Sequence, residues 1–406
     1  MAAVLMRLLR TSAGAALCAA MVSCGGGGGG GSLGPAPPAP SSNVASVVVD
    51  AGPSNDSVNT LFTSVTLCVP GTTTCQTIDH IQIDTASIGL RILAPVLTLA
   101  LPMQTAADGN TLAECTVFAD GYSWGPIEQA DVQIAGESAS SLSVQVIGVT
   151  GFTAVPADCS SSGPIAEDTV ASFGANGILG IGVFIQDCGP ACASAATTPW
   201  YYSCSASACQ ATAVPLMSQV TNPVSQFATD NNGSIIQLPT VASQGDLNVT
   251  GSLIFGIDTQ SNNASGTETV LTVDPNSGNL TAAFNGQSLS ASFIDSGSNG
   301  IFFNDSNILL CTMTNLTDFY CPATAQNLSA TLQGVNGMSA VVDFVVGNAQ
   351  SMLTNQPTFT AFPQLAGSNP VPSSFDFGLP FFYGRRVATA LETMTTAVGT
   401  GPYIAF

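Results

Sequence analysis

The sequence has no lysine, only five arginines and a single histidine, and 7% of its 406 residues are charged. Because aspartate and glutamate together number 25, the formal net charge is −20. Such a chain repels phosphate and has no basic cluster to displace counterions, which excludes a nucleic-acid partner. Its 45% of apolar residues also exclude a disordered chain, since they suffice for sizeable cores.

One motif of common active sites is absent as well. No two cysteines have the CxxC spacing of zinc sites, and the single His80 offers little to such a site. We therefore expect neither a metal nor a cofactor, and we interpret His80 as a strand residue.

The first 23 residues (1–23) are typical of an export signal. Arg7 and Arg10 precede an uncharged, alanine-rich stretch, and MVSC ends in Cys24 like the bacterial lipobox, whose cysteine becomes lipidated. Ordinary secretory cleavage near the same place is the alternative. Residues 24–43 are rich in glycine and proline and are typical of a spacer. The sequence thus predicts an exported lipoprotein that its lipid holds at a membrane, either the outer membrane or the cell surface.

No later segment is suited to crossing a bilayer. The most apolar run, residues 90–103, contains Arg91 and two prolines. It is also shorter than the roughly 20 apolar residues that a span needs. We expect this run inside a globular lobe.

The cysteines of the exported part predict disulfides. Ten remain once Cys18 and Cys24 are set aside, and an even number in an exported chain favours pairing. Two close pairs would staple short loops: Cys68 with Cys75, and Cys311 with Cys321. In a further group of four, the spacing leaves the pairing open: Cys188, Cys192, Cys204 and Cys209.

From residue 44 onward the pattern is typical of short β-strands. Runs rich in Val, Ile, Thr, Ser and Phe are interrupted every ten residues or so by Gly, Pro, Asn and Asp. One longer segment, residues 215–227, predicts a helix. The expectation is an all-β chain with few short helices.

The most informative feature is an internal echo. HIQIDTASIGLRI surrounds Asp84, and ASFIDSGSNGIFF surrounds Asp295, 211 residues later. Each segment predicts a strand that runs into a tight turn of aspartate, a hydroxyl residue, a small residue and serine. Two halves that face each other would bring Asp84 and Asp295 together.

With these loops the chain resembles the pepsin-like aspartic endopeptidases, in which two Asp-Thr/Ser-Gly loops meet at the floor of a cleft. It is also similar to a family of exported bacterial lipoproteins. Four further segments match the first family in the right order: residues 114–136 (the flap hairpin), 175–184, 250–260 and 375–392. The resemblance implies a bilobal β architecture, with an N-terminal lobe at residues 44–215 and a C-terminal lobe at 216–406 that flank the cleft.

The resemblance also assigns roles to residues of both loops. Asp84 and Asp295 would activate a water molecule between them and share one proton. The residues that support these loops would be Thr85 and Ser296, which bridge them, Ser87 and Ser298, which hydrogen-bond the carboxylates, and the small residues Ala86 and Gly297. The residues that pack behind the loops would be Ile178, Leu179 and Gly180 for the first and Gly378 for the second.

Several positions depart from the family pattern. Ala86 stands where the first loop normally has glycine. In the flap, Phe118 replaces a tyrosine that caps the substrate, and Arg91 replaces the tryptophan that bonds this tyrosine. The rebuilt flap would comprise Phe118, Asp120, Gly121, Tyr122 and Trp124, with Tyr122 or Trp124 as the capping group or as ordinary hairpin packing. Near the C-terminus, Asp376 stands where an apolar residue is expected and Leu379 where aspartate is common.

The resemblance favours an enzyme. The function it implies is hydrolysis of extended polypeptide substrates by a membrane-anchored, monomeric aspartic endopeptidase. The alternative is a catalytically inactive pepsin-like protein that binds a ligand or acts at the cell surface, for which Ala86 and the altered flap are the evidence. Two mutually repelling carboxylates have no evident use in a binding protein, so their pairing favours catalysis.

Overall fold

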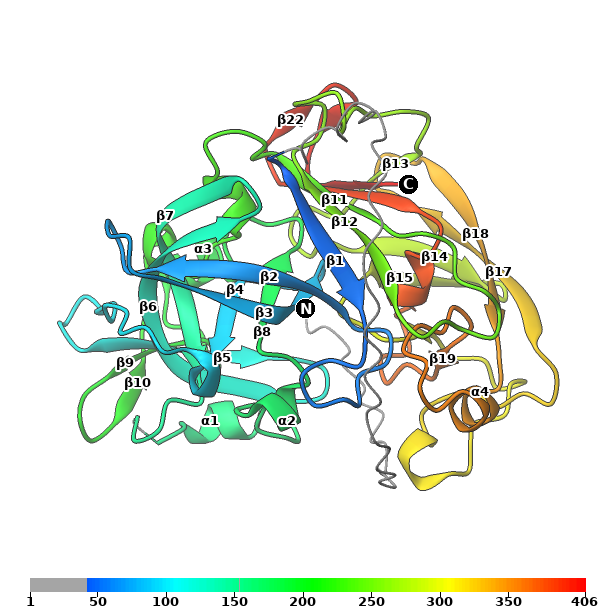
Figure 1. Cartoon of the computed structure of the whole chain (residues 1–406), viewed down its shortest axis with the longest axis horizontal. Coiled ribbons are helices and arrows are strands. Elements are labelled where there is room, and N and C mark those ends of the chain that lie inside the picture. The colour runs from blue at the N-terminus through cyan, green and yellow to red at the C-terminus, as the bar shows by residue number, and fades with distance from the viewer. Residues whose placement is uncertain (1–41, 153) are drawn as a thin grey trace, which may run out of the picture.

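The computed structural model describes residues 42–406 except residue 153. Figure 1 shows two β-rich lobes side by side, one made mainly of the blue-to-green part of the chain and the other of the yellow-to-orange part. Helices are few and short. The expected all-β, bilobal architecture is thus confirmed.

Strands β1 to β10 precede residue 215. Their bounds are Val44–Val49 (β1), Leu61–Cys68 (β2), Cys75–Asp84 (β3), Ile88–Leu93 (β4), Thr111–Val117 (β5), Tyr122–Ile134 (β6), Glu137–Ile147 (β7), Gly177–Ile181 (β8), Tyr201–Cys204 (β9) and Cys209–Ala211 (β10). The helical turns of this part are Ala94–Val96 (η1), Ala157–Ser160 (α1), Val170–Phe173 (α2) and Pro190–Ser194 (α3).

Strands β11 to β24 complete the chain. Their bounds are Gly233–Gln237 (β11), Val249–Phe255 (β12), Val270–Thr272 (β13), Leu280–Phe284 (β14), Gln287–Ile294 (β15), Ile301–Phe302 (β16), Gln326–Gln333 (β17), Ser339–Val346 (β18), Ala366–Gly367 (β19), Asp376–Phe377 (β20), Arg386–Ala390 (β21), Thr395–Thr396 (β22), Gly399–Thr400 (β23) and Tyr403–Ala405 (β24). The helical turns are Leu216–Ser218 (η2), Pro223–Gln226 (η3), Thr314–Leu316 (η4), Ala349–Asn355 (α4) and Leu379–Phe381 (η5).

Strand β1 joins the two lobes. It pairs antiparallel with β12 of the second lobe from Val44, opposite Ile254, to Val49, opposite Val249. At Val48 and Val49 it also pairs with β2 of the first lobe. A continuous sheet therefore runs from β10 through β1 to β13 and crosses from one lobe to the other (Figure 1).

The two lobes repeat one strand arrangement around their aspartate loops. In the first, β3 is parallel to β8, β8 is antiparallel to β4, and β4 is parallel to β7. In the second, β15 is parallel to β20, β20 is antiparallel to β16, and β16 is parallel to β19. The two similar sequence segments around Asp84 and Asp295 therefore lie in equivalent strand arrangements.

Local sequence explains how β15 is set up. It follows β14 through Asn285 and Gly286, which both have positive φ, 49° and 75°. Asn-Gly is the preferred pair for the hairpin turn whose twist matches that of the strands. Burial alternates at the end of β15, from the buried Ser292 through the partly exposed Phe293 to the buried Ile294, next to Asp295.

The helix predicted for residues 215–227 is wrong. The structure has two short 3₁₀ turns there, η2 and η3, separated by an extended stretch. Pro223 begins the second turn and Asn222 caps it by accepting a hydrogen bond from the Val224 N–H. Because proline clashes with the preceding turn of a helix, the segment cannot be continuous.

All ten cysteines of the described residues are paired. The expected bridges Cys68–Cys75 and Cys311–Cys321 are present. The group of four pairs locally, and the remaining two cysteines join β5 to α1: Cys188–Cys192, Cys204–Cys209 and Cys115–Cys159. Five disulfides indicate an extracellular or exported protein. Within residues 42–406, no helix is long and apolar enough to cross a membrane.

Candidate active site

The two echoed aspartates end equivalent strands and are fully buried. Asp84 is the last residue of β3 and lies opposite Gly180 of β8, while Asp295 directly follows β15. The Asp295 N–H donates to the carbonyl of Phe377 in β20 at 3.0 Å. Both aspartate side chains have 0% exposure. Each carboxylate is therefore fixed by a central strand of its own lobe.

Reciprocal hydrogen bonds connect the two loops through Thr85 and Ser296. The Thr85 hydroxyl accepts from the Ser296 N–H at 2.9 Å, and the Ser296 hydroxyl accepts from the Thr85 N–H at 3.2 Å. Each hydroxyl also donates across the lobe boundary, Thr85 to the Ile294 carbonyl at 3.1 Å and Ser296 to the Ile83 carbonyl at 2.9 Å. These four bonds hold the loops in one relative position.

Gly297 marks the point where the carboxyl groups converge. A Cβ on this residue would lie 2.8 Å from Asp84 Cγ and 3.0 Å from Asp295 Oδ1, closer than real Cβ atoms approach other groups or at that limit. Its N–H donates to Asp295 Oδ1 at 2.7 Å, and its carbonyl accepts from Gln82 Nε2 at 2.9 Å. Because Asp84 comes from the first lobe, the two carboxyl groups meet across the boundary.

Ala86 occupies the equivalent place in the first loop without disturbing it. Its N–H donates to Asp84 Oδ1 at 2.7 Å, the same length as the bond from Gly297 to Asp295. The methyl group is half-buried. An alanine is therefore compatible with the loop geometry at this position.

The two serines of the loops behave differently. The Ser298 hydroxyl donates to Asp295 Oδ2 at 2.8 Å, whereas Ser87 Oγ and Asp84 Oδ2 are buried without a hydrogen-bond partner among the described residues. The expected bond from Ser87 to the carboxylate is therefore missing. Ser87 lies in the bend before β4, which begins at the next residue, Ile88, while β16 begins three residues after Ser298.

Electrostatics couple the two aspartates. Burial, followed by the charges of Asp84 and Asp376, raises the pKa of Asp295 well above its usual value. Two carboxyl groups this close cannot both ionise easily, so they share a proton and titrate as a pair. The pair can therefore offer an acid and a base at one place.

The residues expected behind the loops lie there. Gly180 packs on the first loop, because a Cβ on it would lie 2.5 Å from the Ile88 nitrogen, and Gly378 packs on the second, 2.6 Å from the Ser298 carbonyl by the same measure. Leu179 is fully buried in the main core, and Ile178 is 1% exposed in a second apolar cluster.

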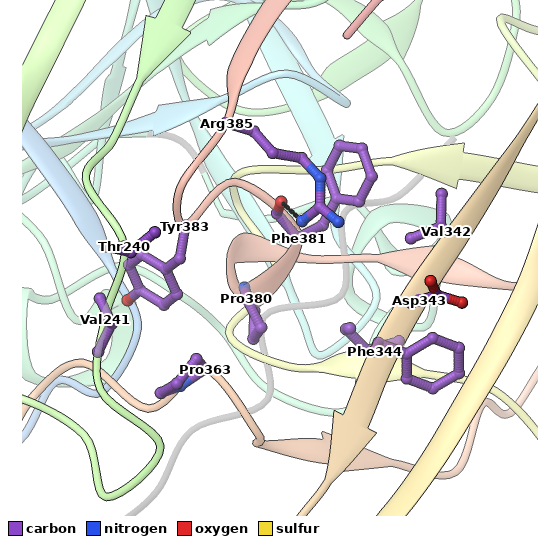
Figure 2. A pocket seen from close by; sticks show the side chains of 11 residues that line it. Thr240, Val241, Val342, Asp343, Phe344, Pro363, Pro380, Phe381, Tyr383 and Arg385 are labelled. Atoms are coloured by element: carbon purple, nitrogen blue, oxygen red, sulfur yellow. Dashed lines mark hydrogen bonds between the residues drawn. The ribbon is translucent and has the colours of Figure 1, made fainter.

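The chain beyond Gly378 lines a cavity of about 180 Å³. In Figure 2, Arg385 reaches over Phe381 of η5, with its guanidinium carbon 4.6 Å from the ring centroid and its Nη1 donating to the Phe381 carbonyl at 2.5 Å. Burial lowers the pKa of Arg385, and Asp343 partly offsets this. The contacts hold η5, the element after Gly378, to the start of β21.

The flap hairpin is anchored at its tip. The Phe118 N–H donates to the Gly121 carbonyl at 2.8 Å, with Asp120 between them, and Tyr122 exchanges backbone hydrogen bonds with residues 165 and 167. Phe118 is 5% exposed and makes an edge contact with Phe173. These contacts fix the path of the hairpin.

Trp124 is also held in packing, because it is 7% exposed and has an edge contact with Tyr202 at 5.3 Å. This burial favours hairpin packing for Trp124. Tyr122 is only half-buried and remains the better candidate for contact with a substrate.

A buried ionic network supports the flap, and sequence reasoning did not find it. Arg91 is 2% exposed and pairs with Glu114 of β5 at 2.6 Å and with Asp187 at 3.2 Å. Its Nε donates to Thr116, also on β5, at 2.8 Å. Burial would lower the pKa of Arg91, but Glu114 and Asp187 outweigh this effect and raise it. An arginine within an apolar strand run was the available signal, because a buried cation requires carboxylate partners.

No described group of three or more His, Cys, Asp or Glu residues is arranged to hold a metal ion. A search of the curated proteins found no match. One matching solved structure is titled "Crystal structure of aspartic proteinase from Irpex lacteus"; the alignment covers 89% of this chain and 96% of that one, at 15% identity and a TM-score of 0.49. The model of the family described as "Protein of unknown function (DUF3443)" matches residues 39–406. Because this match extends over most of the sequence, the chain belongs to that family.

Proposed function

We propose that the protein is an exported aspartic endopeptidase in which Asp84 and Asp295 activate a water molecule to hydrolyse peptide bonds. The single observation that carries this proposal is the convergence of the two buried carboxyl groups at Gly297, within loops that Thr85 and Ser296 tie together. The cost of burying two carboxyl groups side by side is high, and proton sharing gives them a chemical use.

The mechanism follows from one shared proton. The ionised carboxylate takes a proton from water as the water oxygen attacks the scissile carbonyl carbon, and the protonated carboxyl donates its proton to the carbonyl oxygen. In the second step the carboxyl group that took the proton from water donates it to the amide nitrogen, and the other carboxylate takes a proton from a hydroxyl of the tetrahedral diol as the carbon–nitrogen bond breaks. The products are a carboxylic acid and an amine, and the pair again holds one proton. Every proton passes between the pair and the water or substrate, so these steps call on no cofactor.

The first loop favours this proposal over an inactive binding protein. The sequence argument for inactivity rested on Ala86 and the altered flap, and the first of these is weakened because the Ala86 N–H keeps a 2.7 Å hydrogen bond to Asp84 Oδ1. The carboxylate thus has the same backbone support as Asp295 has from Gly297. The substrate would be an extended polypeptide, covered by the flap near Tyr122.

The remaining parts of the proposal concern location. We place a signal peptide at residues 1–23, a lipid on Cys24, a spacer up to residue 43, and lobes at 44–215 and 216–406, in a monomer on the outer membrane or cell surface. Cys24 and most of the spacer lie outside the described residues. The five disulfides support export.

The test is peptide cleavage by the disulfide-bonded protein. Wild type should cleave a broad peptide library at acidic pH and bind a statine-type inhibitor, while Asp84→Asn and Asp295→Asn should abolish turnover, because an amide can neither share the proton nor activate water. The exposed Asp318 provides a matched control, and Asp318→Asn should keep full activity. A folded wild type that neither cleaves the library nor binds the inhibitor would favour the binding protein.

A further inference from the structure

Gln82 is a buried glutamine that reaches from the first lobe to the second aspartate loop. It lies in β3, two residues before Asp84, and has 0% exposure. Its Nε2 donates to the Gly297 carbonyl at 2.9 Å. The reverse orientation of the amide would place two acceptor oxygens against each other, so this bond determines which end of the side chain faces the loop.

Packing within β3 does not explain a glutamine at this position. Its neighbours in the strand, Ile81 and Ile83, are apolar and fully buried. Gln82 Oε1 is buried and accepts no hydrogen bond from the described residues. Because a buried polar atom without such a bond destabilises the folded state, stability alone would favour an apolar side chain here. The bond to the other lobe accounts for the amide.

Gly297 is a residue whose peptide needs such a bond. Glycine is required there, because a Cβ would lie 2.8 Å from Asp84 Cγ. A glycine backbone is also the most permissive one. The residue that lets the carboxyl groups converge therefore also lets the following peptide rotate, and the bond from Gln82 restricts that rotation.

The first loop has neither the glycine nor the glutamine. The equivalent of Gly297 in that loop is Ala86, whose Cβ restricts the backbone. The equivalent of Gln82, two residues before Asp295, is Phe293, whose ring has no hydrogen-bond donor. The amide donor is therefore present only for the loop that contains the glycine.

The peptide held by Gln82 leads directly to Ser298. Because a peptide is planar, the bond to the Gly297 carbonyl also orients the Ser298 nitrogen. The Ser298 carbonyl accepts from the Leu379 N–H at 2.7 Å, so both peptides that flank Ser298 are held. From this position the Ser298 hydroxyl donates to Asp295 Oδ2 at 2.8 Å.

We propose that Gln82 is a positioning residue that holds the Gly297–Ser298 peptide and so keeps the Ser298 hydroxyl on the Asp295 carboxylate. A side chain of one lobe thereby controls a hydrogen bond to the carboxylate of the other lobe. The use of this arrangement in catalysis rests on the proposed function of the dyad, in which one carboxylate must be ionised.

The proposal predicts a change in the lower pKa of the aspartate pair, because a hydrogen bond to a carboxylate favours its ionised form. Asp84 and Asp376 are the titratable groups that act on Asp295. Gln82 carries no charge at any pH, so it can affect this ionisation only through hydrogen bonding.

The first experiment measures this pKa and does not need enzyme activity. A carbon-13 NMR titration of protein labelled at its aspartates follows the carboxyl carbons of the pair, which Asp84→Asn and Asp295→Asn identify. Ser298→Ala should raise the lower pKa by about one unit, and Gln82→Met should raise it by less. The double variant should match Ser298→Ala, because both changes act through one hydrogen bond.

The second experiment measures peptide cleavage by the same variants. Gln82→Met should lower kcat about tenfold, leave KM unchanged, and move the acidic limb of the pH profile up together with the pKa. Gln82→Asn keeps an amide but is one methylene shorter, so it should behave alike and replaces the methionine variant if that one does not fold. Gln219→Met is the matched control and should keep the wild-type pKa and kcat, because this fully buried glutamine bonds the backbone of Gly189 and Val214 and neither loop of the dyad.

Each result bears on one part of the proposal. The positioning role is refuted if a folded Gln82 variant keeps the wild-type pKa, or keeps the wild-type kcat in an active enzyme. It is also refuted if the shifts of Gln82→Met and Ser298→Ala add, or if Gln219→Met reproduces them. If the pKa shifts as expected but the wild type cleaves no peptide, the protease proposal fails while the control of Ser298 by Gln82 is supported.

Discussion

Gly297→Ala tests the geometry of the dyad with a single methyl group. The new Cβ would lie 2.8 Å from Asp84 Cγ, 2.9 Å from Asp84 Oδ1 and 3.0 Å from Asp295 Oδ1, so the carboxyl groups or the loop must move by several tenths of an ångström. The four bonds through Thr85 and Ser296 resist that movement. A displacement of about 1 Å at reacting groups costs on the order of 100-fold in rate, and overpacking costs about 1–3 kcal/mol of stability.

The assay combines peptide hydrolysis, statine-type inhibitor affinity and thermal unfolding. We expect Gly297→Ala to lose about 100-fold in kcat while the disulfide-bonded domain remains folded. Ala86→Gly is the matched control in the other loop; its N–H bond to Asp84 is unaffected, so kcat should stay within a few-fold of wild type. An unchanged kcat in folded Gly297→Ala would refute the inferred convergence of the carboxyl groups at this residue.

Three further predictions concern pH, the buried ions and the anchor. Burial raises the pKa of Glu128 to about 7. The folded state therefore binds more protons than the unfolded state between about pH 4.5 and 7, and the free energy of unfolding falls as pH rises through that range. Glu128→Gln should raise the melting temperature at pH 7 and leave it unchanged at pH 4. Arg91→Met leaves Glu114 and Asp187 buried without their cation and should cost about 3–5 kcal/mol in urea unfolding, so a loss under about 1 kcal/mol would contradict the network. Cys24→Ala should move the protein from the membrane to the soluble fraction, and continued membrane association would argue against lipidation.

Features that repeat along the chain were predictable from it. Alternating apolar residues and regular turn residues predicted the β architecture, and the matched loops at Asp84 and Asp295 predicted that the lobes would face each other. The bridges Cys68–Cys75 and Cys311–Cys321 were also predictable, because each pair is close in the sequence, whereas the pairing within the group of four cysteines was left open. In each case the sequence pattern that allowed the prediction is either local or present in both halves of the chain.

Features that depend on one unrepeated long-range contact were missed. The Cys115–Cys159 bridge joins a strand to a helical turn 44 residues later, and the Arg91 network combines side chains from separate elements. The apolar spacing of residues 215–227 predicted a helix, but Pro223 within this segment prevents a continuous helix. The spacing of the serines, which is the same in both loops, also does not reveal that Ser298 bonds Asp295 while Ser87 makes no such bond to Asp84.

The course of β1 determines how the two lobes would bear a force applied through the N-terminal part of the chain. A force transmitted through the chain before Val44 acts on β1 along the axis of that strand. Antiparallel hydrogen bonds are perpendicular to the strands, so this force shears all of the β1–β12 bonds together instead of opening them one at a time. Because β1 also pairs with β2, the load is shared between both lobes.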